Sequence, residues 1–223
     1  MSCFHLFHVL RANVGEKVTI LNGQGYYGEG RILDDKTQEI AIDDVYFAEK
    51  NRIILYPALL KKKAMDFLIR EATAIGVAEI IPIITEHSLI KIDGKAIAEK
   101  QFHWNNIAKE ACKQSGNPNL PYIEIPQPIE QINFTRPTVV ASLQKVTKDI
   151  FFYKDIIVNG TINLMIGPEG DFSEREYQYF LDRNAHFVYL GRNILRSETA
   201  ALYLLSVIDH ILLTSAKRCH EYE

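Results

Sequence analysis

Four short apolar segments constrain the fold of this chain more than any other feature. They are the runs RIILYPALL, TVVASL, INLMIG and HFVYLG, which begin at residues 52, 138, 162 and 186. Each has the length of a buried strand, and segments with helical spacing of apolar residues lie between them. Strands that alternate with helices form a mostly parallel sheet that is covered on both faces. We therefore expect an α/β domain.

Helical patterns follow several of these runs. The segment KKKAMDFLIREATAIG stops at Gly76, a residue well suited to the position after a helix. The segment KQFHWNNIAKEACKQS also has a helical pattern, and SEREYQYFLDRN opens with a capping box of Ser173 and Glu176. The stretch VAEIIPII is predicted to be a further strand. The apolar residues at helical spacing in the first segment are Met65, Leu68, Ile69 and Ala72.

Residues 14–47 follow a different pattern. Short alternations of apolar and polar residues are divided by NGQG and DDKT, so this stretch predicts a small antiparallel barrel or sheet. Gly23, Gly25 and Gly28 match the dinucleotide motif G-x-G-x-x-G letter for letter. That motif requires a helix after it, whereas strand-forming residues follow here. We interpret these glycines as a hairpin turn.

The overall composition argues against several classes of protein. The 223 residues carry a net charge of −3, which gives no hint of a nucleic-acid partner. The apolar stretch TAALYLLSVIDHILL contains Asp209 and His210 and falls short of the ~18 to 20 residues of a membrane span. The N-terminus lacks the pattern of a secretory signal, so we expect a cytoplasmic protein with no membrane partner. Cys3, Cys112 and Cys219 are far apart, so we expect neither disulfides nor a metal.

Two glycine-containing loops follow two of the predicted strands. The turn Gly167–Gly170 separates a buried strand from a capped helix, and Gly191 precedes the final helix. Open α/β sheets bind ligands at the carboxyl ends of their strands, and glycine lets the backbone approach a ligand closely. No P-loop lysine follows, and Glu169 and Asp171 would repel a triphosphate. These loops suit a flat adenine and a ribose, although tight connections without a ligand remain the alternative.

These two loops lie in the segments LMIGPEGDFSERE and LGRNILRSETAA. Both segments resemble the signature motifs of the bacterial 16S rRNA uridine-N3 methyltransferase family, in the SPOUT class of enzymes that use S-adenosylmethionine (SAM). Upstream, FHVLRANVGEKVTILNGQG resembles the family's N-terminal RNA-binding module. LIREATAIGVAEIIPIITEHS resembles its first helix–strand unit and NIAKEACKQSGNPNLP its middle helix. The resemblance covers nearly the whole chain.

The resemblance implies the fold and the cofactor site. It implies a PUA-like RNA-binding β-barrel over residues 1–50 and a SPOUT α/β domain over residues 51–223, with a C-terminal trefoil knot and a homodimer. Only the resemblance predicts the knot, because knots are rare exceptions to chain topology. SAM would lie bent between the two glycine loops. The residues implied to bind it are Leu164, Gly167, Gly170, Leu190, Gly191, Ile194, Leu195 and Ala200.

Two charged residues at the start of the final helix are the candidate catalytic residues. Arg196 stays protonated in a protein and cannot serve as an ordinary base. It can instead stabilise the negative charge that spreads onto the uracil oxygens when N3 loses its proton. Glu198 could orient Arg196 or accept that proton. The alternative is a structural ion pair between Arg196 and Glu198.

Other residues are candidates for contact with RNA. Arg11 and the run Lys61, Lys62 and Lys63 are the expected phosphate contacts, although a solvated helix start also explains that run. His5 and His8 are more typical of partly buried strand residues. Trp104 and Phe102 could stack on a base, but their spacing favours core packing.

The sequence departs from the family pattern at a few positions. Asp171 stands where a third glycine is common. His87 and Asn117 each stand where an arginine is common, which removes two cations that could meet RNA. The chain also begins close to the HVLR stretch, so we expect a barrel that is incomplete or closed differently.

Three hypotheses follow for the function. The first is a SAM-dependent methyltransferase for N3 of a uridine in 16S rRNA, acting on the assembled small ribosomal subunit. The second keeps the enzyme class but changes the target to a ribose 2′-hydroxyl or another RNA. The third is an RNA-binding ribosome assembly factor without catalysis.

Overall fold

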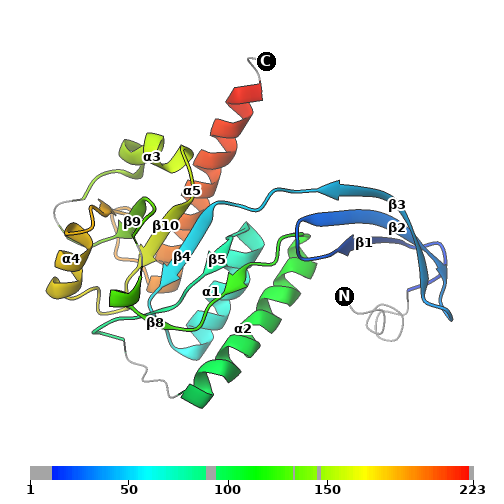
Figure 1. The fold of residues 1–223 in the computed structure, drawn as a ribbon, viewed down its shortest axis with the longest axis horizontal. Helices are drawn as coiled ribbons and strands as arrows, with labels where there is room; N and C mark the ends of the chain where they lie inside the picture. The colour runs from blue at the N-terminus through cyan, green and yellow to red at the C-terminus, as the bar shows by residue number, and fades with distance from the viewer. Residues whose placement is uncertain (1–11, 89–93, 133, 145–146, 221–223) are drawn as a thin grey trace.

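A computed structural model describes residues 12–88, 94–132, 134–144 and 147–220. Figure 1 shows a small N-terminal sheet that extends to one side of a larger sheet flanked by helices. Arg11, His5 and His8 lie outside the described residues, so the phosphate contact of Arg11 and the strand positions of His5 and His8 stay predictions. In the part of the chain that the structure describes, no helix is long and apolar enough to cross a membrane.

The first three strands form an antiparallel sheet. They are β1 (Lys17–Leu21), β2 (Tyr26–Asp34) and β3 (Glu39–Phe47), in the order β1-β2-β3. The turn between β1 and β2 contains Gly23 and Gly25, and the Asn22 side chain accepts the backbone N–H groups of Gln24 and Tyr26. The hairpin interpretation of the glycine motif is therefore confirmed for Gly23 and Gly25, while Gly28 lies within β2. Over the described residues this sheet is open, and no closed barrel forms.

The second sheet is the centre of the molecule and consists entirely of parallel pairs. Its strand order is β11-β9-β10-β4-β5-β7, so the predicted α/β class with a parallel sheet is confirmed. The strands are β4 (Ile53–Pro57), β5 (Glu79–Ile80), β7 (Tyr122–Ile123), β9 (Thr138–Ala141), β10 (Ile162–Ile166) and β11 (His186–Val188). The four apolar runs of the sequence contain the four strands β4, β9, β10 and β11.

Alternate residues of these strands point into two separate apolar clusters. Ile53 and Leu55 of β4 belong to one cluster, while Ile54 and Tyr56 belong to the other. A strand with both faces buried needs an apolar residue at every position, which explains the continuous apolar runs. The sheet therefore has a hydrophobic core on each face.

Helices cover the two faces unequally. The first cluster includes residues of α1 (Lys62–Ile75), α2 (Gly94–Ser115), α3 (Lys154–Val158) and α5 (Ser197–His220). The second cluster is covered by α4 (Glu174–Leu181) and the short 3-10 helix η2 (Ile129–Gln131). A further 3-10 helix, η3 (Ile150–Tyr153), precedes α3. Both predicted helix-end signals are confirmed: Gly76 is left-handed with a φ of 108°, and Ser173 and Glu176 form the capping box.

The stretch VAEIIPII is not the single strand that the sequence predicts. It divides into β5 in the central sheet and β6 (Ile83–Ile84), which pairs with β8 (Gln127–Pro128) in a two-stranded sheet. Pro82 lies between the two strands. Proline has no N–H for a ladder hydrogen bond, so it separates the two pairings.

The loop before β7 joins the N-terminal sheet to the central domain. The Gly25 N–H donates to the Pro118 carbonyl at 3.0 Å, and the Asn119 side chain donates to the Ala48 carbonyl at 3.1 Å. Asn117 donates to the Thr73 carbonyl at 2.9 Å and accepts the Asn119 N–H at 2.9 Å. Asn117 thus shapes this loop, although an arginine is common at its place in the family that the sequence resembles.

Gly30 should be intolerant of a side chain, because a Cβ there would lie 2.3 Å from the Ala41 carbonyl oxygen of β3. We expect Gly30→Ala to lower the free energy of unfolding by about 1–3 kcal/mol, as overpacking does. Urea denaturation followed by circular dichroism measures this. Gly160→Ala is the control, because a Cβ there meets no atom within 4 Å. Equal stability of the two variants would contradict the close approach of β2 and β3.

Candidate functional site

A cavity lies where the carboxyl ends of β9, β10 and β11 meet. Its volume is about 250 Å³, just below the range of roughly 300–1,000 Å³ that is usual for ligand sites. The Ser142 N–H donates to the Val188 carbonyl at 3.0 Å, which holds the ends of β9 and β11 together. Three loops line the cavity: Ala141–Gln144 after β9, Ile166–Asp171 after β10, and Tyr189–Ala200, which leads from β11 into α5.

The loop after β10 makes a tight turn against the cavity. The Asp171 N–H donates to the Pro168 carbonyl at 3.0 Å, and Asp171 has a φ of 60°. A Cβ on Gly167 would lie 3.2 Å from the Phe172 ring, so this position favours the absence of a side chain. Gly167 therefore brings its backbone to the cavity wall, beside Pro168, Glu169 and Asp171.

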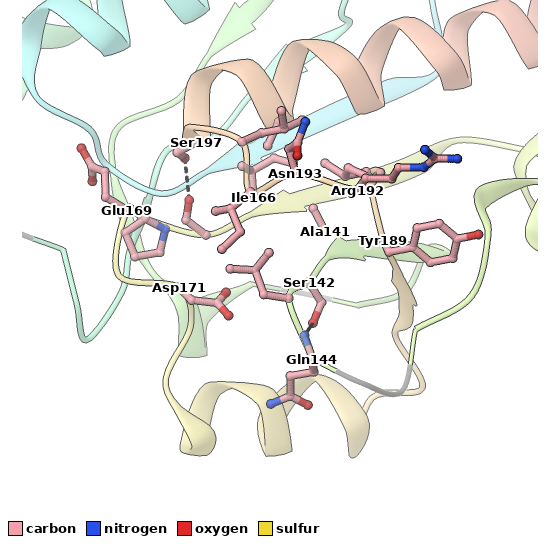
Figure 2. A pocket seen from close by; sticks show the side chains of 18 residues that line it. Ala141, Ser142, Gln144, Ile166, Glu169, Asp171, Tyr189, Arg192, Asn193 and Ser197 are labelled. Atoms are coloured by element: carbon pink, nitrogen blue, oxygen red, sulfur yellow. Dashed lines mark hydrogen bonds between the residues drawn. The ribbon is translucent and has the colours of Figure 1, made fainter.

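The loop after β11 returns across the same edge of the sheet. It starts at the outer strand, passes Gly191 with a φ of 134°, and reaches the loop after β10. There the Ser197 hydroxyl donates to the Gly167 carbonyl at 2.5 Å, an interaction drawn as a dashed line in Figure 2. Ser197 is also the first residue of α5, so one side chain joins the helix start to the turn after β10.

Polar and apolar side chains share the cavity wall. Figure 2 shows Ser142, Gln144 and Asp171 on the side of α4, with Arg192 and Asn193 nearer to α5. The Tyr189 hydroxyl points away from these groups and donates to Asp149 at 3.3 Å. Among the described residues, no group of three or more His, Cys, Asp or Glu side chains could hold a metal ion.

The structure brings most of the predicted cofactor residues together. Leu164 and Gly170 are the exceptions, because neither lines the cavity. Leu164 is fully buried within β10, and Gly170 faces the His87 ring, where a Cβ would lie 3.4 Å from the His87 Cβ. The predicted residues that line the cavity are Gly167, Leu190, Gly191, Ile194, Leu195 and Ala200.

The sequence pattern predicts only a strand in the run TVVASL and does not predict the third loop, Ala141–Gln144. The carboxyl end of this strand lies at the same edge as those of its parallel neighbours. Ser142 lies at the end of this run and Gln144 follows it, so the polar residues where each apolar run ends are the signal that identifies this loop. The missing information was which strands are neighbours in the sheet.

The candidate catalytic residues lie at the rim of the site. Arg196 is exposed and does not line the cavity, although Leu195 and Ser197 on either side of it do. Glu198 is half-buried in the first turn of α5. Arg196 and Glu198 are both described, and no ion pair forms between their side chains. The structure therefore does not contain the alternative, a structural ion pair between Arg196 and Glu198.

The lysine run lies at the edge of the sheet that holds the cavity. Lys61, Lys62 and Lys63 are exposed at the start of α1, shortly after the end of β4. The Ala58 N–H donates to the Ile166 carbonyl at 2.8 Å, so the segment before this run is hydrogen-bonded to the end of β10.

The two aromatic residues of α2 have different outcomes. Trp104 is 3% exposed, as core packing predicts, whereas Phe102 is 70% exposed and its predicted core position is wrong.

Comparison with known proteins identifies the class and then the family. A parallel α/β sheet with a loop-lined cavity at its carboxyl edge is the architecture of a cofactor-binding α/β enzyme. A family model described as an RNA methyltransferase domain matches residues 48–209, well over half of the chain. The chain belongs to this RNA methyltransferase family.

Individual relatives agree with this assignment. A protein of Borreliella burgdorferi named ribosomal RNA small subunit methyltransferase E 2 is 30% identical over 213 residues, which cover 93% of this chain and 88% of the relative. Ribosomal RNA small subunit methyltransferase E of Aquifex aeolicus is 34% identical over 162 residues, which cover 70% of this chain and 67% of the relative. A methyltransferase from Legionella pneumophila, solved with bound SAM, superposes with a TM-score of 0.80 at 28% identity and covers 94% of this chain and 88% of its own.

The His87 contact should make stability depend on pH. The hydrogen bond to the Asp171 carbonyl, at 2.9 Å from Nδ1, raises the pKa of His87, and the carboxylates of Glu86 and Glu176 act in the same direction. A histidine whose pKa is higher in the folded state stabilises the folded protein when it is protonated. This contribution is fully present below the unfolded-state pKa of about 6.5 and is lost as the pH rises through the folded-state pKa. We expect the stability difference between wild type and His87→Asn to be larger at pH 5.5 than at pH 8.5. Urea denaturation at both values measures this, and a difference that grows with pH contradicts it.

Proposed function

We propose that this protein is a SAM-dependent methyltransferase that modifies N3 of a uridine in 16S rRNA on the assembled small ribosomal subunit. The observation that carries the proposal is the cavity at the carboxyl edge of β9, β10 and β11, within the segment that matches the RNA methyltransferase model. The names of the relatives support rRNA of the small subunit as the substrate. Such a substrate supports a cytoplasmic location.

The residues around the cavity fit SAM. Ile166, Leu190, Leu195 and Ala200 provide apolar surface for an adenine, and the backbone of Gly167 and Gly191 can approach the ligand closely. The Asp171 carboxylate, on the cavity wall nearest to α4, gives the cavity a negative group that favours a cation such as a sulfonium. SAM supplies a sulfonium-activated methyl group when bound. The protein's part is to position the uracil and to manage its N3 proton.

Arg196 is the candidate to stabilise negative charge that develops on the substrate. It is exposed at the rim, between two residues that line the cavity, and the described residues offer its guanidinium no ion pair. A guanidinium in this position can donate hydrogen bonds to the uracil carbonyl oxygens, which become negative as N3 loses its proton. Glu198, half-buried two residues later, is the candidate to orient Arg196 or to accept that proton.

We assign RNA contact to Arg11 and to Lys61, Lys62 and Lys63. The lysines are exposed at the sheet edge that carries the cavity, where their charges can reach phosphates without reading the base. Arg11 lies outside the described residues and enters this proposal from the sequence alone. By holding the RNA backbone, phosphate contacts of this kind would position the target uridine over the cavity.

We further propose a PUA-like RNA-binding unit over residues 1–50 and a SPOUT unit with a trefoil knot over residues 51–223. The first unit is supported by the antiparallel sheet β1-β2-β3, which ends at Phe47, before β4 begins at Ile53. The knot is supported by the loop after β11, which crosses the ends of its neighbours so that Ser197, the first residue of α5, contacts Gly167. A homodimer is supported by exposed apolar side chains on α5, including Tyr203 and Leu213.

The first test is methyl transfer itself. We expect label from the radioactive methyl group of SAM to enter small ribosomal subunits that lack the modification, and to appear as 3-methyluridine after digestion and nucleoside analysis. Label in a different nucleoside or in a ribose 2′-O-methyl group would keep the enzyme class and reject the target. Subunit binding without label would favour the assembly factor.

Arg196→Ala should lower kcat by roughly 10²–10³-fold, the usual effect of removing a group that stabilises developing negative charge. SAM affinity and the circular dichroism spectrum should stay near wild type, because Arg196 does not line the cavity. Arg175→Ala, an equal loss of charge on the exposed side of α4, is the control and should keep wild-type kcat. Normal turnover in Arg196→Ala would reject the assigned role.

A further inference from the structure

Asp171 adopts a backbone conformation that glycine reaches without strain. Its φ is 60°, in the left-handed region that few other residues occupy, although aspartate tolerates it better than most. The side chain has a definite partner: the Tyr177 hydroxyl donates to both carboxylate oxygens of Asp171, at 2.9 and 3.0 Å. Asp171 belongs to the loop after β10, and Tyr177 lies on α4.

The Tyr177 hydroxyl also joins the loop after β9. It accepts a hydrogen bond from the Ser142 hydroxyl at 2.9 Å, and the Ser142 oxygen accepts the Gln144 N–H at 3.0 Å. Figure 2 shows the bond between Ser142 and Gln144, with Asp171 on the same side of the cavity. The Gln144 N–H donates to Ser142, Ser142 donates to Tyr177, and Tyr177 donates to Asp171, so these bonds run in one direction from Gln144 to Asp171. Such chains strengthen each bond by mutual polarisation.

Tyr177 is buried behind the cavity wall rather than in it. Its side chain is 4% exposed, and its ring packs against Phe172 and Phe187 at centroid distances of 5.9 and 5.8 Å. Burial raises the pKa of Tyr177, so the phenol remains a hydrogen-bond donor across the working pH range. Ser142 and Asp171 line the cavity, whereas Tyr177 does not.

A second contact holds the same loop from its other side. His87 Nδ1 lies 2.9 Å from the Asp171 carbonyl oxygen and 3.2 Å from that of Gly170. The Glu176 carboxylate accepts the N–H of Glu86 at 2.8 Å and that of Ser173 at 2.8 Å, which fixes the turn carrying His87 to the start of α4. The backbone of residues 170–171 is therefore anchored independently of the Asp171 side chain.

We infer that Tyr177 is a positioning residue for the cofactor, which sets the distance between the loops after β9 and β10 through Ser142 and Asp171. This inference rests on the proposed SAM-dependent function. Tyr177 lies outside the cavity lining, so it acts on binding through those two side chains. Its removal leaves a serine and a carboxylate without their shared partner, and the two loops gain freedom that binding must then restrict.

Tyr177→Phe tests this inference, because it removes one oxygen and keeps the ring that packs in the core. We expect the Kd for SAM, measured by calorimetry, to rise roughly tenfold, an order of magnitude typical of a lost hydrogen bond to a charged group. At saturating SAM, kcat should stay within about twofold of wild type. Amide hydrogen exchange of the ligand-free protein should quicken in residues 142–144 and 167–171.

Tyr179→Phe is the matched control on the same helix. Its hydroxyl donates to the Glu130 carbonyl at 3.1 Å, away from the cavity, so Kd and exchange in the two loops should match wild type. Asp171→Asn keeps an acceptor for Tyr177 but removes the negative charge, so it should weaken SAM binding less than Asp171→Gly, which removes both the acceptor and the charge. Adding Tyr177→Phe to Asp171→Gly should change Kd little further, because both substitutions break the same chain of bonds.

Two results overturn the inference. One is wild-type SAM affinity and exchange in Tyr177→Phe, and the other is a fall in kcat with an unchanged Kd. If Tyr177→Phe fails to fold, judged by its circular dichroism, the comparison of Asp171→Asn with Asp171→Gly carries the test. Absence of SAM binding by the wild-type protein rejects the proposed function instead, and hydrogen exchange of the free protein still reports whether Tyr177 holds the two loops.

Discussion

The parallel pairing of β9 with β10 and β11 is the constraint on which the rest of this structure depends. Asn163, Leu164 and Met165 of β10 pair with Thr138, Val139 and Val140 of β9, and β11 pairs with the other edge of β9. Parallel strands in register end at one edge, so their three following loops meet there. Both faces of these strands are buried, and a slip by one residue would exchange the sets of side chains that the two cores receive. Burial of both faces of these strands therefore fixes their register, and the register in turn fixes the positions of the three loops at the site.

Hydrogen bonds between loops then shape the cavity that this alignment creates. Ser197 attaches the start of α5 to the carbonyl of Gly167, while Tyr177 attaches Ser142 to Asp171. The first contact joins the loops after β10 and β11, and the second joins those after β9 and β10. Loops that present backbone to a ligand have few side chains of their own with which to pack. Their order has to come from contacts of this kind with neighbouring helices.

The N-terminal sheet and the central domain meet at a small polar joint. Backbone and side-chain hydrogen bonds of Pro118 and Asn119 connect the hairpin turn to the loop before β7. Nearby, the Asn51 side chain donates to Asp209 of α5 at 2.7 Å, and burial raises the pKa of that aspartate. These contacts link the connection between β3 and β4 to the helix that begins at the cavity, so the proposed RNA-binding unit has a defined attachment to the proposed catalytic one.

The sequence alone determined the local features of this protein. The continuous apolar runs predicted the parallel sheet, the residues Ser173 and Glu176 predicted the helix cap, and the glycines identified two of the three cavity loops. These features depend on neighbours within a few residues, which a sequence displays directly. Tertiary structure decided the rest: it buried Leu164, turned Gly170 toward His87, divided VAEIIPII at Pro82 and added Ser142 and Gln144 to the cavity. Each of these outcomes depends on which strands lie side by side, and that order is set by the packing of distant segments against both faces of the sheet.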